Sequence, residues 1–294
     1  MLISVFSPKG GVGVTTCAAL FAKALSKDHS TMLVETCKGD LEAMLALENI
    51  ANYGFLDWAV SENPRVETLE KISNFFDNQL SLVVGEIPKK SKSDEYNEHQ
   101  TEFIQNSDFN FSPIVASLAS VEGHCVVDCS NGTTRLQRKI IEASDVVVMV
   151  LRQCYTGLYR ATQSELIDQV DAVLVVQESG RSISSNQIAQ TLSCGVLLEI
   201  EARRDFARAI DSGTLWSRTP EKLIGPIEQF VGDLIEKQKP ATLVGEDVFQ
   251  DTANRNQFEF WNEASKNRSS AKMTQASSRF GEHTRRLLNQ DPNR

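Results

Sequence analysis

Long hydrophobic runs are missing from this sequence. No apolar stretch approaches the ~20 residues that span a bilayer, so no transmembrane helix is predicted. Met1 leads directly into the first predicted strand, so we expect no signal peptide ahead of it. The six cysteines form no CxxC pair, and we expect most of them to serve as small apolar residues. These absences favour a reduced, cytoplasmic protein.

Metal-binding signatures and an excess of positive charge are absent as well. The four histidines are dispersed and show no metal-ligand spacing with a cysteine, which argues against a zinc site. The sequence has 30 lysines and arginines against 39 aspartates and glutamates, a net charge of −9. That balance argues against general coating of nucleic acid. Two local basic clusters remain as DNA-binding candidates, at 203–208 (RRDFAR) and at Lys89, Lys90 and Lys92.

The sequence does contain a series of short, unbroken apolar runs. Hydrophobic residues make up 41% of 294 residues, enough for a substantial core in one large or two modest domains. Runs rich in Val, Ile and Leu without polar alternation are typical of buried parallel strands. Helical spacing of apolar residues separates several of them. The pattern predicts an α/β fold, a doubly wound and mainly parallel sheet of about seven strands with helices on both faces. The expected strands are 2–6, 31–35, 80–84, 124–128, 145–151, 171–177 and 195–200.

Two polar regions interrupt this alternation. Residues 86–112 mix both charges with few apolar residues, which predicts a mobile surface insertion. Residues 239–294 are polar throughout, apart from small apolar clusters near Trp261 and Leu288. We therefore expect a domain at 1–238 and a partly helical or disordered tail at 239–294.

A glycine-rich stretch, KGGVGVTT at residues 9–16, lies between the first predicted strand and an apolar helix. Glycines let the backbone curl so that consecutive N–H groups point at one phosphate, and the helix N-terminus adds positive charge. Thr15 stands where a hydroxyl would ligate Mg²⁺ on a nucleotide. A glycine turn capped by threonine is the alternative, but the flanking elements and Lys9 favour a phosphate-binding loop. The candidate nucleotide-binding residues are Gly10, Gly11, Val12, Gly13, Val14, Thr15 and Thr16.

This loop resembles the deviant Walker A motif, KGGxGK[ST], of the ParA/MinD family of P-loop ATPases. The resemblance extends from residue 1 to about residue 237. It implies a MinD-like P-loop NTPase fold with Mg-ATP or Mg-ADP as the ligand. In that family the first lysine, here Lys9, reaches across a nucleotide-sandwich homodimer to the partner's phosphates. The second lysine of the motif is replaced by Val14.

Further stretches resemble the acidic motifs of the same family. Residues 124–132 (HCVVDCSNG) resemble the Walker B strand, which implies that Asp128 binds Mg²⁺ through a water. The alternative is that Asp128 only caps a turn. Residues 32–47 resemble the segment in which a second aspartate positions the attacking water. Glu35 and Cys37 stand at the two aspartate positions and Asp40 at a later one, so Glu35 is a candidate substitute acid. Which of the three side chains faces the site depends on the strand register.

The segments that contact the nucleotide base in the ParA/MinD family resemble this sequence less closely. Gln177 stands where the family often has an asparagine that contacts the adenine edge, and its amide offers the same donor and acceptor. A plain polar residue at a strand end is the equal alternative. Asp205, Ala209 and Gly213 fit the spacing of the loop and helix that close over the base.

The departures from the family pattern bear on function. Removing one electrostatic contact to a transition state typically slows a reaction by about 10²–10³, so Val14 and Cys37 predict weak or absent ATP hydrolysis. Several segments, among them 152–161 (RQCYTGLYRA), most resemble the CpaE/TadZ-like branch, which positions pilus or secretion machinery at cell poles. We expect a nucleotide-binding positioning or scaffold protein with a protein partner in such an assembly.

Two other functions stay open. One is an active ATPase of the plasmid or chromosome partition type, or of the septum-site type, acting on DNA or membrane. The other is a pseudo-ATPase that dimerises without nucleotide. DNA is the less favoured partner because the chain is acidic. Residues 279–290 combine basic residues with a thin apolar face, which allows weak peripheral contact with the inner membrane or cell pole through the tail.

Overall fold

The computed structural model describes residues 1–37, 40–47, 51–77, 79–86, 109–193 and 197–238. Met1–Gln238 form one compact unit. Within the described residues, eight strands form a single sheet in the order β3-β4-β2-β5-β1-β6-β7-β8. Seven of these strands pair in parallel, and only β3 runs antiparallel, to β4. The strands are β1 Leu2–Phe6, β2 Thr31–Glu35, β3 Asn74–Phe75, β4 Leu80–Val83, β5 His124–Asp128, β6 Val146–Arg152, β7 Ala172–Gln177 and β8 Leu197–Glu201.

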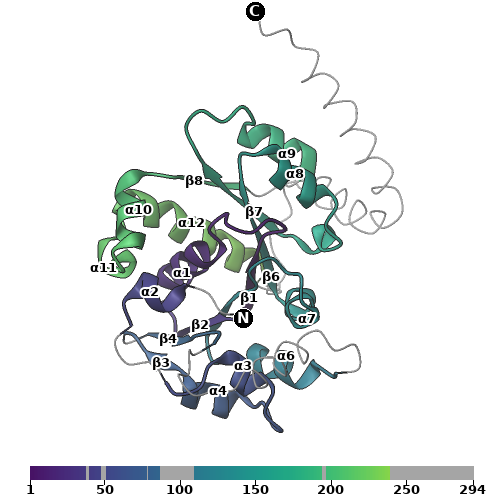
Figure 1. The fold of residues 1–294 in the computed structure, drawn as a ribbon, viewed down its shortest axis with the longest axis vertical. Helices are drawn as coiled ribbons and strands as arrows, with labels where there is room; N and C mark the ends of the chain where they lie inside the picture. Colours follow the sequence, from purple (N-terminus) through teal and green to yellow (C-terminus); the bar gives the residue numbers. More distant parts are fainter. Residues whose placement is uncertain (38–39, 48–50, 78, 87–108, 194–196, 239–294) are drawn as a thin grey trace, which may run out of the picture. The chain divides into compact units, whose positions relative to one another are not determined.

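Helices cover both faces of this sheet (Figure 1). α1 and α12 pack together on one face, where the rings of Phe21 and Phe230 meet edge to face at 5.9 Å. α7 lies against β1 from the other face. The helices are α1 Val14–Leu25, α2 Leu41–Leu45, α3 Phe55–Ala59, α4 Val66–Ile72, α6 Ser112–Ala119, α7 Arg135–Ala143, α8 Tyr155–Thr162, the 3₁₀ turn η1 Ile167–Gln169, α9 Ser185–Leu192, α10 Arg204–Asp211, α11 Leu215–Arg218 and α12 Glu221–Gln238.

The predicted fold class is confirmed, and each of the seven expected strands is present within two residues of its predicted ends. The apolar runs are strands because both faces of each are covered, so alternation with polar residues is not needed. β3 was not predicted from the sequence, because its two residues are too short to give a periodic signal.

Three details differ from the expectations or lie beyond them. α12 begins at Glu221 and contains Pro226 in its interior, because Leu223 and Ile224 extend the buried stripe of this helix ahead of the proline. At the end of the expected insertion, Phe111 is buried and α6 starts at Ser112. Most of that insertion, 87–108, and the whole expected tail, 239–294, lie outside the described residues.

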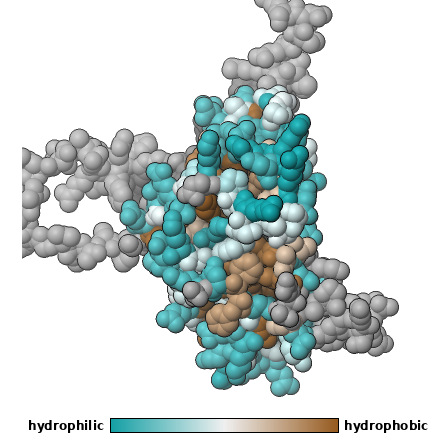
Figure 2. All heavy atoms as spheres, turned by 90° about the vertical axis from the view of Figure 1, so that its left-hand side faces the viewer, coloured by the Kyte–Doolittle hydropathy of each residue, from teal (hydrophilic) through white to brown (hydrophobic). Residues whose placement is uncertain are grey.

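The β3 side of the sheet presents apolar surface. Figure 2 faces this side of the molecule and shows hydrophobic residues gathered in its lower half. Phe75 of β3 is 87% exposed, while Phe76 and Trp216 are partly buried with their rings 5.1 Å apart. The exposed Phe75 ring belongs to the β3 edge of the sheet and not to the loop between β1 and α1. Among the described helices none is long and apolar enough to cross a membrane.

Candidate nucleotide site at the carboxyl edge of the sheet

The loop after β1 has a backbone that its glycines make possible. Gly11 and Gly13 adopt positive φ values of 72° and 100°, and Gly13 directly precedes α1. Positive φ is strained for residues that carry a Cβ. A Cβ added at Gly11 or Gly13 would meet nothing within 4 Å, so at these two positions the backbone conformation, not crowding, calls for glycine. The loop is followed directly by the twelve-residue helix α1, whose first N–H groups lack intrahelical partners.

Val12 and Val14 point into the core, where they are only 1% and 8% exposed. Position 14 therefore carries no charge toward the loop and contributes to packing. Thr15 and Thr16 are half-buried at the first turn of α1. The Thr15 hydroxyl lies beside the Asp128 carboxylate and acts to lower its pKa, whereas the Thr16 hydroxyl makes only a weak contact, 4.0 Å from the Met44 sulfur.

Asp128 ends β5 beside this loop and is 3% exposed. Burial raises the pKa of its carboxyl, while hydrogen bonds from Thr15 and from the Ser130 N–H act in the opposite direction. The Ser130 N–H donates to Oδ1 at 2.7 Å. Thr36 donates both its N–H and its hydroxyl to the Asp128 carbonyl oxygen, which fixes the end of β5 to the end of β2. The carboxylate thus does cap a turn, and it also lies within hydrogen-bond reach of the candidate Mg²⁺ ligand Thr15.

Glu35 ends β2 directly opposite Asp128 in the strand register. Its two carboxyl oxygens accept the N–H groups of Leu41 at 3.3 Å and Gly85 at 3.1 Å. Burial raises the pKa of Glu35 to about 7, against the opposing effect of the Gly85 hydrogen bond. Glu35 thereby links the loop after β2 to the loop after β4.

The other two candidates after β2 lie differently. Cys37 is half-buried and hydrogen-bonds Ser130, and burial raises the pKa of its thiol to about 11, with Asp128 adding to the effect. Asp40 is exposed at the start of α2. Gly85 approaches this loop so closely that an added Cβ would lie 1.8 Å from the Cys37 carbonyl oxygen.

Gln177 and Asp205, the side chains expected near the nucleotide base, are held by contacts with neighbouring residues. Gln177 ends β7, and its Nε2 donates to Glu199 at 2.6 Å and to Ser185 at 3.4 Å. Asp205 is exposed in the first turn of α10, where it accepts from the Phe206 N–H and pairs with Arg203. That pairing holds the pKa of the Asp205 carboxyl below its usual range.

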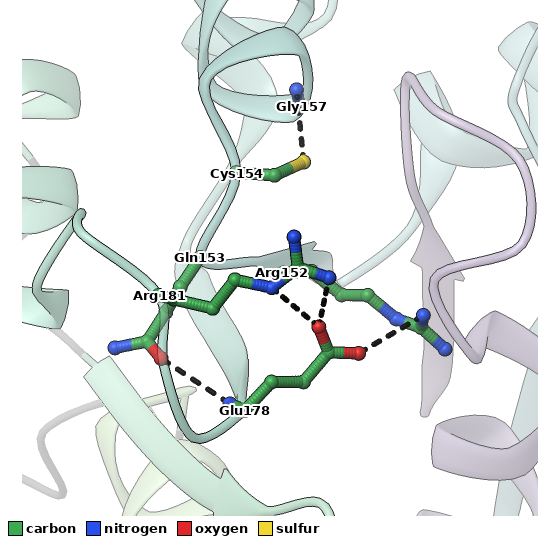
Figure 3. A network of polar contacts seen from close by, with 6 residues as sticks. All are labelled: Arg152, Gln153, Cys154, Gly157, Glu178 and Arg181. Atoms are coloured by element: carbon green, nitrogen blue, oxygen red, sulfur yellow. Dashed lines mark hydrogen bonds and ion pairs between the residues drawn. The ribbon is translucent and has the colours of Figure 1, made fainter.

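The structure also brings together a charged group that the sequence analysis did not nominate. Arg152 ends β6 and pairs through Nη1 with Glu178 at 3.0 Å, and Arg181 pairs with the same carboxylate from the other side (Figure 3). Lys9 lies near the start of α8, with its Cδ 3.7 Å from where a Cβ of Gly157 would stand. The sequence signal that could have pointed to Arg152 is its position as a single arginine at the end of the apolar run 145–152.

Comparisons with known proteins agree with this architecture. No protein-family model matches the chain, and no curated protein sequence matches it. Among solved structures, the septum site-determining protein MinD from Pyrococcus horikoshii complexed with Mg-ADP superposes with a TM-score of 0.64 at 15% identity, covering 81% of this chain and 98% of that one. A ParA family ATPase from Chlorobium tepidum gives 0.62 at 18% identity, over 78% and 96% of the two chains.

This chain has the ParA/MinD fold. The MinC:MinD cell division complex from Aquifex aeolicus matches as well, with a TM-score of 0.59 at 21% identity over 83% of this chain and 99% of that one. The fold that the KGGVGVTT loop implied is therefore confirmed. In this ParA/MinD-like chain the loop, Thr15 and Asp128 come together, with Glu35 and Cys37 beside them. Gln177 and Asp205 lie at the ends of other elements, in contacts of their own.

Proposed function

We propose that this protein is a ParA/MinD-type nucleotide-binding positioning or scaffold protein that binds Mg-ATP and Mg-ADP and hydrolyses ATP slowly or not at all. One observation carries the binding half of this proposal. The loop after β1 has Gly11 and Gly13 at positive φ ahead of α1, with the Thr15 hydroxyl beside the Asp128 carboxylate at its base. Such a loop presents backbone N–H groups and a helix N-terminus to a phosphate.

The residues present fit a bound Mg-nucleotide in three respects. The space around the loop glycines is open, since a Cβ at Gly10, Gly11 or Gly13 meets nothing within 4 Å. The Thr15 hydroxyl and the Asp128 carboxylate are the oxygen donors that Mg²⁺ prefers. A bound Mg²⁺ would neutralise phosphate charge. The protein would hold the phosphates through backbone N–H groups and the ion through Thr15 directly and Asp128 by way of a water.

The proposal of slow ATP hydrolysis rests on side chains that either cannot supply a charge to the phosphates or already hydrogen-bond other groups. Phosphoryl transfer depends on positioning and on neutralising charge at the phosphates. Val14 is packed in the core and Cys37 is a neutral thiol with a raised pKa. Glu35 accepts two backbone N–H groups that tie the neighbouring loops together. Its use as a substitute acid would require breaking these bonds, so we propose that it acts as a structural acceptor.

The remaining parts of the proposal concern assembly. We propose a homodimer in which Lys9 contacts the partner's nucleotide, with 1–238 as the nucleotide-binding domain and 239–294 as an appended segment. A protein partner in a polar, secretion or pilus assembly would be the target. The Aquifex MinD, which shares the fold, is seen in complex with MinC, which supports a protein partner. Peripheral membrane contact through 279–290 and contact with DNA are secondary options.

The deciding experiment is calorimetric titration of the full chain with Mg-ATP, beside two glycine variants. Gly13→Val should abolish binding, because it puts a β-branched side chain at φ 100° where the loop meets α1. Gly180→Val is the matched control, because Gly180 also has a positive φ of 80° with nothing within 4 Å of an added Cβ, but lies after β7. We expect binding in wild type and in Gly180→Val. Absence of heat in wild type at millimolar Mg-ATP would contradict the proposal.

An active ATPase is the second candidate, favoured by the intact Lys9. The test is steady-state phosphate release with and without DNA or anionic vesicles, for wild type and Lys9→Ala. Stimulated turnover that is lost in Lys9→Ala would establish this candidate. Turnover indistinguishable from the variant, with binding intact, supports the scaffold.

A further inference from the structure

The loop between β1 and α1 lacks its lysine, but a different cation stands beside it. β6 is longer than β1, and their register pairs Phe6 with Met149, so β6 continues for three residues after β1 has ended. Arg152, the last of these residues, is therefore level with the glycine loop on the neighbouring strand. Neighbouring strands lie only about 4.8 Å apart, so an arginine side chain spans the distance to the loop.

The side chain of Arg152 also belongs to the correct face of the sheet. Val146, Val148 and Val150 line the core that α1 covers, and side chains along a strand alternate between faces. Arg152 continues that row and emerges beside the first turn of α1. By the same alternation Asp128 continues the row that contains Val126 on β5. The loop is thus flanked by a carboxylate from β5 on one side and a guanidinium from β6 on the other.

Two further features agree with this placement. The buried Cys17 thiol, in the first part of α1, has its pKa raised by burial and by Asp128 and lowered by Arg152, so both charged groups lie close enough to α1 to act on this thiol. Figure 3 shows the Arg152 side chain extending from β6 toward the purple ribbon of the N-terminal segment, whereas Arg181 reaches Glu178 from the opposite direction.

The hydrogen-bonding of Arg152 is incomplete in the described part of the chain. Its Nη1 pairs with Glu178, but its buried Nε has no hydrogen-bond partner there. Buried polar groups of proteins are nearly always paired. A guanidinium carries five N–H donors in a planar fork that suits phosphate oxygens.

We propose that Arg152 supplies the phosphate-binding cation that Val14 does not, and that Glu178 holds it in place when no nucleotide is bound. The proposal rests on the proposed nucleotide-binding function. On binding, the phosphates compete with the Glu178 carboxylate for the guanidinium, and Arg181 remains as the cation that pairs with Glu178. The two arginines thus differ in role although both contact one carboxylate.

The test is titration of the full chain with Mg-ATP, Mg-ADP and AMP for wild type and single variants. Arg152→Ala should weaken Mg-ATP binding by about tenfold, as expected for a charged hydrogen bond, and leave AMP binding nearly unchanged. Arg181→Ala is the matched control, with the same charge change and the same partner, and should stay within about twofold of wild type.

Glu178→Gln keeps Arg152 and removes its carboxylate partner, so it should tighten Mg-ATP binding. A loss of folding cannot imitate such a gain, which keeps the test valid if Arg152→Ala is unstable. Equal affinity of wild type and Arg152→Ala for Mg-ATP, or weaker binding by Glu178→Gln, would overturn the role of Arg152 while leaving the proposed function standing. Absence of binding by wild type would overturn both.

Discussion

The two sides of the carboxyl edge of the sheet offer different kinds of contact to a ligand. On the phosphate side, at the ends of β1, β2 and β5, the candidate contacts are backbone N–H groups shaped by Gly11 and Gly13, with one hydroxyl and one carboxylate. On the base side, at the ends of β7 and β8, the candidates are long side chains, and Gln177 and Asp205 are already bonded to Glu199 and Arg203. Backbone conformation is kept when side chains are substituted. A phosphate-binding loop can therefore keep its shape after its lysine has been replaced.

The largest expected effect contrasts Gly85, which packs against the loop after β2 on the phosphate side, with Gly180 on the base side. Gly85→Ala should lower the free energy of unfolding by about 3 kcal/mol, because the new Cβ would lie 1.8 Å from the Cys37 carbonyl oxygen. Gly180→Ala should cost about 1 kcal/mol, because only its positive φ is strained and no atom is within 4 Å. Urea denaturation of both variants measures the difference. Equal losses would mean that the phosphate side is no more tightly packed than the base side.

The second prediction concerns Glu35 and pH. Its pKa of about 7 in the folded protein exceeds the ordinary 4.5, so the folded state holds a proton that the unfolded state releases. Wild type should therefore lose up to about 3 kcal/mol of stability, relative to Glu35→Gln, as the pH rises from about 4.5 to about 7. Denaturation of both proteins at pH 5 and pH 8 gives this difference.

The comparison with the variant is needed because His124 acts in the opposite direction. Burial lowers the pKa of His124 to about 4, so stability gained from this residue increases as the pH rises from about 4 to 6.5. The two effects offset each other in the wild-type curve alone. A stability difference between wild type and Glu35→Gln that does not change with pH would show that Glu35 is not buried against Gly85.

The third prediction concerns the metal contact on the phosphate side. Thr15→Ala should weaken Mg-ATP binding by about tenfold and leave metal-free ATP binding much less affected, because only the hydroxyl contact to the ion is lost. Thr15→Ser keeps the hydroxyl and serves as the control. Titrations with and without EDTA separate the two cases, and equal losses in both would argue against a metal role.

The smallest effects are expected on the base side. Gln177→Ala should change Mg-ATP affinity by less than about threefold, the lower end of what one hydrogen bond contributes, because its amide already donates to Glu199. Asp205→Asn should leave stability within measurement error, since exposed ion pairs contribute little. A larger loss of affinity in Gln177→Ala would show that this amide leaves Glu199 for the base, and would weaken the contrast between the two sides.

Structural features could be predicted from the sequence where a single physical cause determines them. Seven strands could be predicted because burial on both faces requires unbroken apolar runs, and the loop because glycines at positive φ precede a helix. It could not show that both oxygens of Glu35 are used by Leu41 and Gly85, since those N–H groups come from two other loops. Arg152 was missed for a similar reason, because its position depends on how far β6 extends past β1.

The cysteines of the described chain have a practical consequence for spectroscopy. Burial raises the pKa values of Cys17 and Cys125 to about 12, that of Cys129 well above its ordinary value and that of Cys37 to about 11, so these thiols resist alkylation near neutral pH. Cys154 is half-buried at the start of α8, where its sulfur accepts the Gly157 N–H close to Lys9. A maleimide dye attached to Cys154 would therefore place a fluorophore beside the glycine loop.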